Sequence, residues 1–261
     1  MTADQDFAEL AERLADAWVN GTTIPLPPQD AAPRDRADAY VIQDRMAELI
    51  GQPVVGWKVG ASVPCVQLFE GHDGPLPGRI FADRCYQNEA AVPAALYHGA
   101  KIETEFAFRL TEALPAHDVT RADLESRLTF HPAIELSATR YAAGTGNRAA
   151  TSFDGIADNA TSGAVVLGDA IDDWHGLTFE TLTLDARIDD SPPLQAYTGA
   201  FRRDPVEIVA ETVNDLRARG IAFEPGMCLL TGSLTLPTPL RQGQTLVIRI
   251  AEFPPVQLEL T

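Results

Sequence analysis

The sequence of this 261-residue chain is short of basic residues, with 20 lysines and arginines against 37 aspartates and glutamates and a formal net charge of −17. Nucleic-acid binding depends on Lys and Arg clusters that neutralise phosphates, and anionic membrane surfaces attract the same side chains. The balance argues against both partners. An anionic ligand would be repelled by the field of the whole chain, so its site must carry local positive charge from a metal, a lysine or an arginine.

Cysteines are also scarce. The three present, Cys65, Cys85 and Cys228, are odd in number and have no metal-type spacing, which argues against a disulfide framework or a zinc site. No apolar run reaches the ~18 residues of a membrane span. The acidic N-terminus lacks the basic-then-apolar order of a secretory signal. We therefore expect the chain in a reducing cytoplasm.

Several catalytic motifs are missing from the sequence as well. Serine-hydrolase elbows, Walker A loops and dinucleotide-binding glycine fingerprints do not occur. No two of the five histidines have a ligand spacing such as i, i+4, and we assign them no metal role. None of them precedes His72.

Apolar side chains at helical spacing predict helices over residues 3–19 and 35–50. Residues 204–219 predict a third helix, because Asp204 is suited to the N-cap, Pro205 to the first helical position, and a glycine follows the end. The clearest predicted strands are 54–60, 101–110, 132–138, 163–167, 177–188, 227–231, 244–250 and 256–260.

Helices therefore flank a β-rich middle that lacks the regular βαβ alternation of a Rossmann fold. This order predicts an α+β protein with a largely antiparallel or mixed sheet. We expect one structural unit overall, with an N-terminal helical segment, residues 1–50, packed on a β-rich catalytic domain, residues 51–261.

Two glutamates lie on one face of the predicted strand KIETEFAFRL, residues 101–110. Glu103 and Glu105 alternate with apolar neighbours, and residues two apart in a strand are separated by about 6.5–7 Å. Two such carboxylates can converge on one hard cation such as magnesium, which prefers oxygen ligands. The alternative is a solvent-facing strand side, on which two glutamates need no function.

A third glutamate favours the metal site. Glu135 lies between Ile134 and Leu136 in an otherwise apolar strand. A carboxylate in that position tends to be buried, and a buried charge must be paired or bind a metal. The alternative here is a salt bridge to the nearby Arg140.

Lys58 is the candidate for the positive charge that an anionic ligand requires. It occupies the middle of the apolar, glycine-flanked run VVGWKVG, where it can pair with a carboxylate or transfer protons. The alternative is a strand-edge lysine that reaches solvent. The polar segment 154–168 and the turn around Ser233 can present hydroxyl and backbone donors to a ligand, or can be ordinary turns.

Taken in order, these segments resemble the fumarylacetoacetate hydrolase superfamily, and within it the branch of 2-hydroxypenta-2,4-dienoate (2-keto-4-pentenoate) hydratases and 4-oxalocrotonate decarboxylases. The segments that carry the resemblance are GWKVG (56–60), VQ (66–67), FADRCY (81–86), IETEFAF (102–108), PAIELSATR (132–140), IADNATSG (156–163) and LLTGSL (229–234).

The resemblance implies a β-rich mixed-sheet roll with flanking helices and a homo-oligomer. It implies that Glu103, Glu105 and Glu135 bind Mg²⁺ or Mn²⁺ and that Lys58 is the active-site lysine. The further residues that fall in pocket-lining segments of the family, and so are expected to bind substrate, are Gln67, Arg140, Ser162 and Ser233.

One departure concerns a loop that in the hydratases reads Pro-Asp-Phe-Gly. Here it reads Pro75-Leu76-Pro77-Gly78, so Leu76 replaces the aspartate. We expect the nearby Asp73 to be the catalytic group that compensates for the missing aspartate.

The resemblance implies that a small anionic 2-oxo acid chelates the metal, which stabilises the enolate that develops at C2. We expect hydration of a 2-hydroxypenta-2,4-dienoate-type acid in aromatic catabolism. Alternatives are decarboxylation of 4-oxalocrotonate, hydrolysis of the C–C bond of an acylpyruvate, or a non-catalytic partner subunit associated with a sister hydratase or decarboxylase. Hydrolysis ranks lower, since the hydrolases resemble a design with a His/Glu pair on an N-terminal lid, and no histidine precedes His72.

Overall fold

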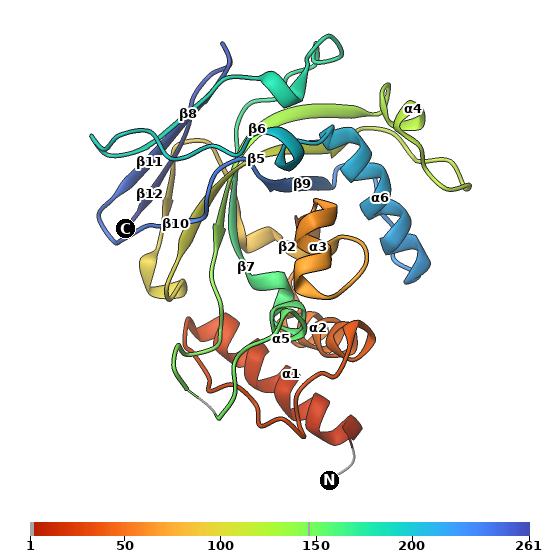
Figure 1. Ribbon diagram of the computed structural model, residues 1–261, viewed down its shortest axis with the longest axis vertical. Helices are drawn as coiled ribbons and strands as arrows, with labels where there is room; N and C mark the ends of the chain where they lie inside the picture. The colour runs from red at the N-terminus through yellow and green to blue at the C-terminus, as the bar shows by residue number, and fades with distance from the viewer. Residues whose placement is uncertain (1–2, 146) are drawn as a thin grey trace.

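The computed structural model describes residues 3–145 and 147–261, and within these ranges the strands form two sheets (Figure 1). The strands of the larger sheet, in their order across it, are β2 (Leu76–Phe81), β1 (Val54–Gly60), β9 (Cys228–Ser233), β5 (Lys101–Leu110), β6 (Leu128–Ser137), β7 (Ser162–Leu167) and β3 (Cys85–Gln87), with β10 (Thr238–Pro239) paired to β5. The smaller sheet has the order β4 (Ala90–Val92), β12 (Val256–Leu260), β11 (Thr245–Ile250) and β8 (Leu184–Ile188).

Both sheets are mixed. In the larger one, β1 runs parallel to β9 and β3 parallel to β7, and the other pairs are antiparallel. In the smaller one, β12 runs parallel to β4. The α+β class and the mixed sheet expected from the sequence are confirmed.

The main core uses the apolar face of β5. Ile102, Phe106 and Phe108 are buried there, and the two phenylalanines make edge-to-face contacts with Phe179. Side chains from β8, β11 and β12 of the smaller sheet belong to the same core. Because strand side chains alternate, this packing directs Glu103 and Glu105 to the opposite face of β5.

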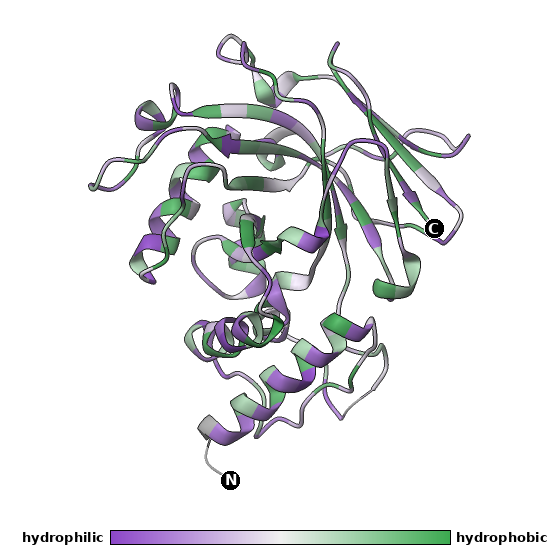
Figure 2. Ribbon diagram, turned by 180° about the vertical axis from the view of Figure 1, so that it is seen from behind, coloured by the Kyte–Doolittle hydropathy of each residue, from purple (hydrophilic) through white to green (hydrophobic). Residues whose placement is uncertain are grey.

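The N-terminal helices α1 (Ala3–Asn20) and α2 (Arg36–Ile50) form a second core beneath the larger sheet (Figure 1). Figure 2 shows the apolar and polar sides of α1 as alternating green and purple segments. The buried sides of both helices pack against Leu76 and Phe81 of β2 and Ile156 of α5 (Ser152–Ala157). The helical segment is thereby joined to the part of the chain that carries Lys58 and the glutamates.

Helix α6 (Pro205–Ala218) begins as its sequence predicts. The Asp204 side chain accepts a hydrogen bond from the backbone N–H of Val206 at 2.9 Å, and Pro205 occupies the first turn. The predicted strand over 177–188 is too long, because residues 179–181 form a 3₁₀ turn and the strand starts at Leu184.

Three elements beside the site were not predicted: β2, α5 and α3 (Pro64–Glu70). The two helices are one or two turns long, too short for a helical period to be visible in the sequence. Helix α5 is instead defined by a capping box, in which Thr151 and Asp154 bond each other's backbone N–H groups.

None of the helices in the described ranges is long and apolar enough to cross a membrane.

Candidate metal centre and its cavity

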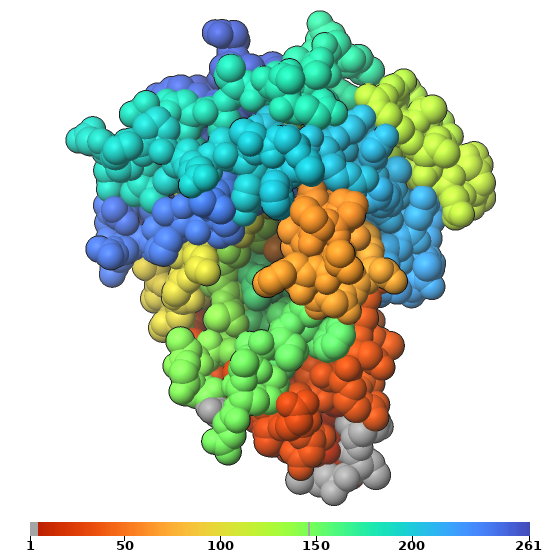
Figure 3. Space-filling view, viewed as in Figure 1, coloured from red at the N-terminus to blue at the C-terminus, as the bar shows by residue number. Residues whose placement is uncertain are grey.

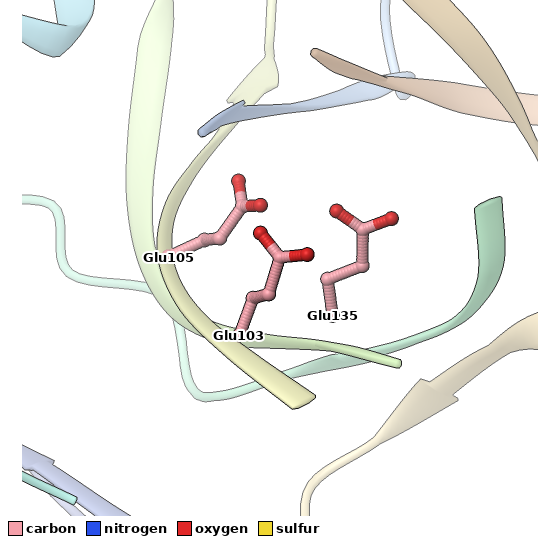
Figure 4. Close-up of side chains that lie close together, drawn as sticks. All are labelled: Glu103, Glu105 and Glu135. Atoms are coloured by element: carbon pink, nitrogen blue, oxygen red, sulfur yellow. The ribbon is translucent and has the colours of Figure 1, made fainter. Parts of the chain in front are cut away.

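Three carboxylates meet on the face of the larger sheet opposite the main core. Glu103 of β5 is paired in register with Glu135 of β6, and Glu105 follows on the same face of β5. One carboxylate oxygen from each of the three lies within 4.8 Å of the others. Figure 4 shows the three side chains converging. The strand register therefore produces the convergence that the Glu-x-Glu spacing suggested.

These carboxylates have few hydrogen-bond donors around them. Glu105 and Glu135 are almost fully buried. Glu105 Oε2 accepts from the backbone N–H of Gly232 at 2.7 Å, and Glu103 Oε1 accepts from the Ser137 hydroxyl at 3.1 Å. Glu105 Oε1 and Glu135 Oε2 are buried and accept no hydrogen bond, and the one cation beside Glu135 Oε1 in the described ranges is the Lys58 ammonium. Buried carboxylate oxygens without donors are costly, and a cation removes that cost.

The electrostatics of the three groups are mutually unfavourable. Burial, followed by the charges of Glu135 and Glu103, raises the pKa of Glu105 well above its ordinary value. Burial and the charge of Glu135 also raise the pKa of Glu103. Like charges in a buried site disfavour joint ionisation unless a positive charge compensates them.

Lys58 supplies part of that positive charge. It is buried on β1, with Nζ 3.1 Å from Glu135 Oε1 and donating to the Ala160 carbonyl at 3.0 Å. Burial alone lowers the pKa of Lys58, but the charges of Glu135, Glu103 and Glu105 together raise it above its ordinary value. Lys58 is therefore held as an ammonium inside the site and does not reach solvent.

One lysine leaves the group of three carboxylates short of positive charge. The salt bridge from Arg140 considered above does not form, because Arg140 pairs with Asp158. The orphaned oxygens, their mutual distances and the all-oxygen donor set fit a hard divalent cation. No histidine belongs to this group of potential ligands in the described part of the chain.

The carbonyl that holds Lys58 belongs to a strained loop. Asn159, Ala160 and Thr161 have φ of 52°, 51° and 54°, in the left-handed region that non-glycine residues rarely enter. The Asn159 side chain fixes this loop to β2 by accepting from the Arg79 backbone N–H at 2.7 Å and donating to the Arg79 carbonyl at 2.9 Å.

Gly78 of β2 makes this close approach possible. A Cβ at this position would lie 2.4 Å from the Asn159 carbonyl oxygen and 2.9 Å from the Ala160 Cβ. Gly78→Ala therefore has to displace the loop, and overpacking of this kind costs about 1–3 kcal/mol. We expect that loss in the free energy of unfolding, measured by urea denaturation.

The matched control for this prediction is Gly176→Ala. A Cβ at Gly176 meets no atom within 4 Å, so its free energy of unfolding is expected to stay within about 0.5 kcal/mol of the parent. Equal stability of Gly78→Ala and Gly176→Ala would contradict the proposed role of Gly78.

Lys58 and Glu103 border a cavity of about 820 Å³, and Glu105 and Glu135 lie buried behind them. Lys58, Glu103, Gly232 and Ser233 are among the polar residues of its lining. Figure 3 shows the surface hollowed beside α3, drawn in orange. The structure thus places the buried charges at a site that a small molecule can enter.

The residues predicted to bind substrate divide into two groups. Ser233 lines the cavity, its hydroxyl donating to the Thr235 carbonyl at 2.7 Å. Three others lie outside the lining. The Gln67 amide donates to the Ala61 carbonyl, Arg140 donates to Asp158 and to the Ser162 carbonyl, and Ser162 is buried at the start of β7.

The loop where an aspartate was expected also differs from the sequence interpretation. Asp73 is exposed and does not line the cavity, whereas Leu76 is buried and does. The structure therefore places an apolar side chain, and no compensating carboxylate from Asp73, at this part of the wall.

Two features of the cavity escaped the sequence analysis. Tyr197 lines it close to Glu103, and burial followed by the Glu103 charge raises the pKa of Tyr197. Glu70 also lines it, with its carboxylate 3.2 Å from His72 Nε2. Tyr197 lies in an irregular segment without periodicity, so no sequence pattern marked it. The Glu70–His72 spacing was visible, but a two-residue separation has no general chemical meaning.

Comparison with known proteins places this geometry in a class. The chain is 34% identical over 239 residues to a 2-keto-4-pentenoate hydratase of Paraburkholderia phymatum, matching 90% of this chain and 89% of the relative. It is 30% identical over 239 residues to the 2-keto-4-pentenoate hydratase of Burkholderia vietnamiensis, with the same coverage of 90% and 89%. No protein-family model matches.

The fold is shared with a solved structure of 4-oxalocrotonate decarboxylase from Pseudomonas putida G7 complexed with magnesium and adipate. The TM-score is 0.86 at 22% identity, covering 100% of this chain and 99% of the other. The hydratase relatives make the chain a lyase, and its fold is of the fumarylacetoacetate hydrolase type. The chain belongs to the 2-keto-4-pentenoate hydratase family.

Proposed function

We propose that the protein hydrates a small unsaturated 2-oxo acid of the 2-hydroxypenta-2,4-dienoate type, with one divalent cation, magnesium or manganese, held by Glu103, Glu105 and Glu135. The observation that carries this proposal is the convergence of three largely buried carboxylates beside a buried lysine at one end of a cavity. The similarity to 2-keto-4-pentenoate hydratases supports hydration as the reaction.

The cation has a defined task in such a reaction. When bound, a divalent cation supplies Lewis-acidic positive charge that polarises an oxo group and offsets the charge of a carboxylate. The glutamates provide oxygen ligands from two adjacent strands. Gly232 and Ser137 orient two of them through the hydrogen bonds described above.

The remaining polar groups act on the substrate directly. Lys58 is the one cationic proton donor among the described lining residues, and Glu135 and Ala160 fix the position of its Nζ. Its ammonium can pair with the substrate carboxylate or donate a proton at the oxo end. The Tyr197 and Ser233 hydroxyls lie on the same lining and can hydrogen-bond the substrate.

Hydration needs no reactant besides water. A proton moves to C5 of the dienol as the 2-hydroxyl loses its own, which gives a 2-oxo-3-enoate. The hydroxyl of a water molecule then adds at C4 and the remaining proton of that water at C3, which gives a 4-hydroxy-2-oxo acid. In both steps negative charge develops on the oxygen at C2, next to the carboxylate, so stabilising positive charge is required at that end of the substrate.

The proposed function is tested with purified protein, with and without Mg²⁺, given 2-hydroxypenta-2,4-dienoate. We expect loss of the diene absorbance only with metal present. The same assay with 4-oxalocrotonate examines the decarboxylase alternative. An unchanged spectrum with both substrates would refute lyase activity.

A second candidate, hydrolysis of an acylpyruvate C–C bond, is favoured by one specific observation. Glu70 lines the cavity and its carboxylate contacts His72, a pair able to activate water. Cleavage of an acylpyruvate that is lost in His72→Asn would establish this activity, and absence of cleavage in the parent protein would exclude it.

A further inference from the structure

We infer that the cavity selects a 2-oxo acid whose chain beyond C4 is apolar, and discriminates against acids with a second carboxylate. This inference rests on the proposed function, which places the acid end of the substrate at Lys58 and the glutamates. It concerns the rest of the cavity, which the reaction chemistry leaves unspecified.

Much of the cavity lining is apolar. We call six of these side chains the apolar wall: Val63, Val66, Phe69, Leu76, Phe153 and Phe201. They come from α3, β2, α5 and the turn at 199–201, or lie next to them. Phe69 is 90% exposed and Phe201 43% exposed, so apolar surface continues to the mouth of the cavity. Exposed apolar surface that is contiguous with a cavity is typical of a binding site.

The charges on the lining do not suit a second carboxylate. Within the described ranges, the charged residues that line the cavity are Lys58, Glu70 and Glu103. Lys58 is committed to Glu135 and to the acid end of the substrate. Glu70 is itself negative. A carboxylate placed along the apolar wall would lose its hydration without gaining a cation, which is strongly unfavourable.

Arg203 is the cation to consider as a partner for a second carboxylate. Its Nη1 donates to the carbonyl of Ser62, a lining residue, at 3.0 Å. Its guanidinium is already paired with Glu211, through contacts of 3.0 and 2.5 Å. It does not belong to the lining of this cavity.

The size of the cavity supports an extended substrate. At about 820 Å³ it lies in the upper part of the ~300–1,000 Å³ range of sites that bury drug-sized ligands. A five-carbon acid would leave much of the apolar wall in contact with water. Each methylene of a longer chain buried against that wall is expected to tighten binding by about fourfold.

The inference is tested by calorimetry on the Mg²⁺-loaded protein with two unreactive acids of equal length, 2-oxohexanoate and 2-oxohexanedioate. They differ only in the terminal group that would meet the apolar wall. We expect 2-oxohexanoate to bind at least about tenfold more tightly, a difference of ~1.4 kcal/mol. Equal affinity, or tighter binding of the diacid, would overturn the inference.

A pair of variants on α3 tests the location of the discrimination. Val66→Arg places a cation on the lining and should shift the affinity ratio at least about tenfold toward 2-oxohexanedioate. Leu68→Arg makes a similar change on the same helix at a side chain that is 83% exposed and outside the lining, and should leave the ratio unchanged. If the two variants had the same ratio of affinities for the two acids, the apolar wall would not be the origin of the discrimination, and the inference would be refuted.

The two proposals fail in different ways. If neither acid binds and 2-hydroxypenta-2,4-dienoate is not consumed, the proposed function is refuted and the inference with it. If the dienoate is hydrated but the diacid binds as well as the monoacid, the inference alone is refuted.

Discussion

Glu105→Gln is expected to lose divalent-metal binding by roughly two to four orders of magnitude in affinity, because removing one partner from a buried charge cluster costs about 3–5 kcal/mol. The substitution keeps the shape of the side chain and an oxygen that can accept from the Gly232 N–H. Calorimetric titration with Mg²⁺ or Mn²⁺ measures the loss, and turnover of the dienoate should fall with it.

The same substitution should stabilise the protein when metal is withheld. Glu105 Oε1 is a buried acceptor without a donor, and the other two carboxylates repel the charge on its side chain. We expect the free energy of unfolding in EDTA to rise by about 1–3 kcal/mol. Glu259→Gln is the control, since Glu259 is exposed on β12 and should change neither quantity. Retained metal affinity in Glu105→Gln would refute the ligand assignment.

Lys58→Met should lower kcat by about 10²–10⁴-fold, the range associated with loss of a positioned acid–base group. Metal affinity should be retained or increased. The ammonium lies 3.1 Å from Glu135 Oε1, where it opposes a second positive charge, and methionine removes that opposition while filling similar volume. Steady-state kinetics at saturating Mg²⁺ and calorimetry of metal binding separate the two effects.

Lys101→Met is the control for this variant. Lys101 is the only other lysine in the sequence and is exposed at the start of β5. Its removal changes the net charge by the same amount and should leave kcat within about twofold of the parent, because exposed substitutions have small effects. A kcat for Lys58→Met equal to that of Lys101→Met would contradict an active-site role for Lys58.

The three glutamates could be predicted from the sequence because side chains alternate between the two faces of a strand. Glu103 and Glu105 share a face by period two, and a carboxylate flanked by Ile134 and Leu136 has to be buried and compensated. The mixed sheet followed from the order of short apolar runs. What alternation does not specify is register, and it is the pairing of Glu103 with Glu135 that brings the carboxylates together.

The rest of the cavity depends on contacts between distant segments. Leu76 was recognised as a departure, but only the packing of β2 shows that it faces the cavity. Tyr197 and Phe201 reach the lining from an irregular segment, and the left-handed run that orients Lys58 through Ala160 is set by the tertiary contact with Gly78. Local propensity contains no information about such contacts.

Strand β5 and the apolar wall are expected to tolerate substitutions to different extents. It is hydrogen-bonded to β9 on one side and to β6 on the other, so a substitution that disturbs its backbone disturbs both neighbours. The apolar wall comes largely from short helices and turns, and replacements of its exposed members, Phe69 and Phe201, cost little folding energy. Natural variation or directed evolution can therefore replace exposed residues of the apolar wall, and so change which substrate chains bind, while the three glutamates are retained.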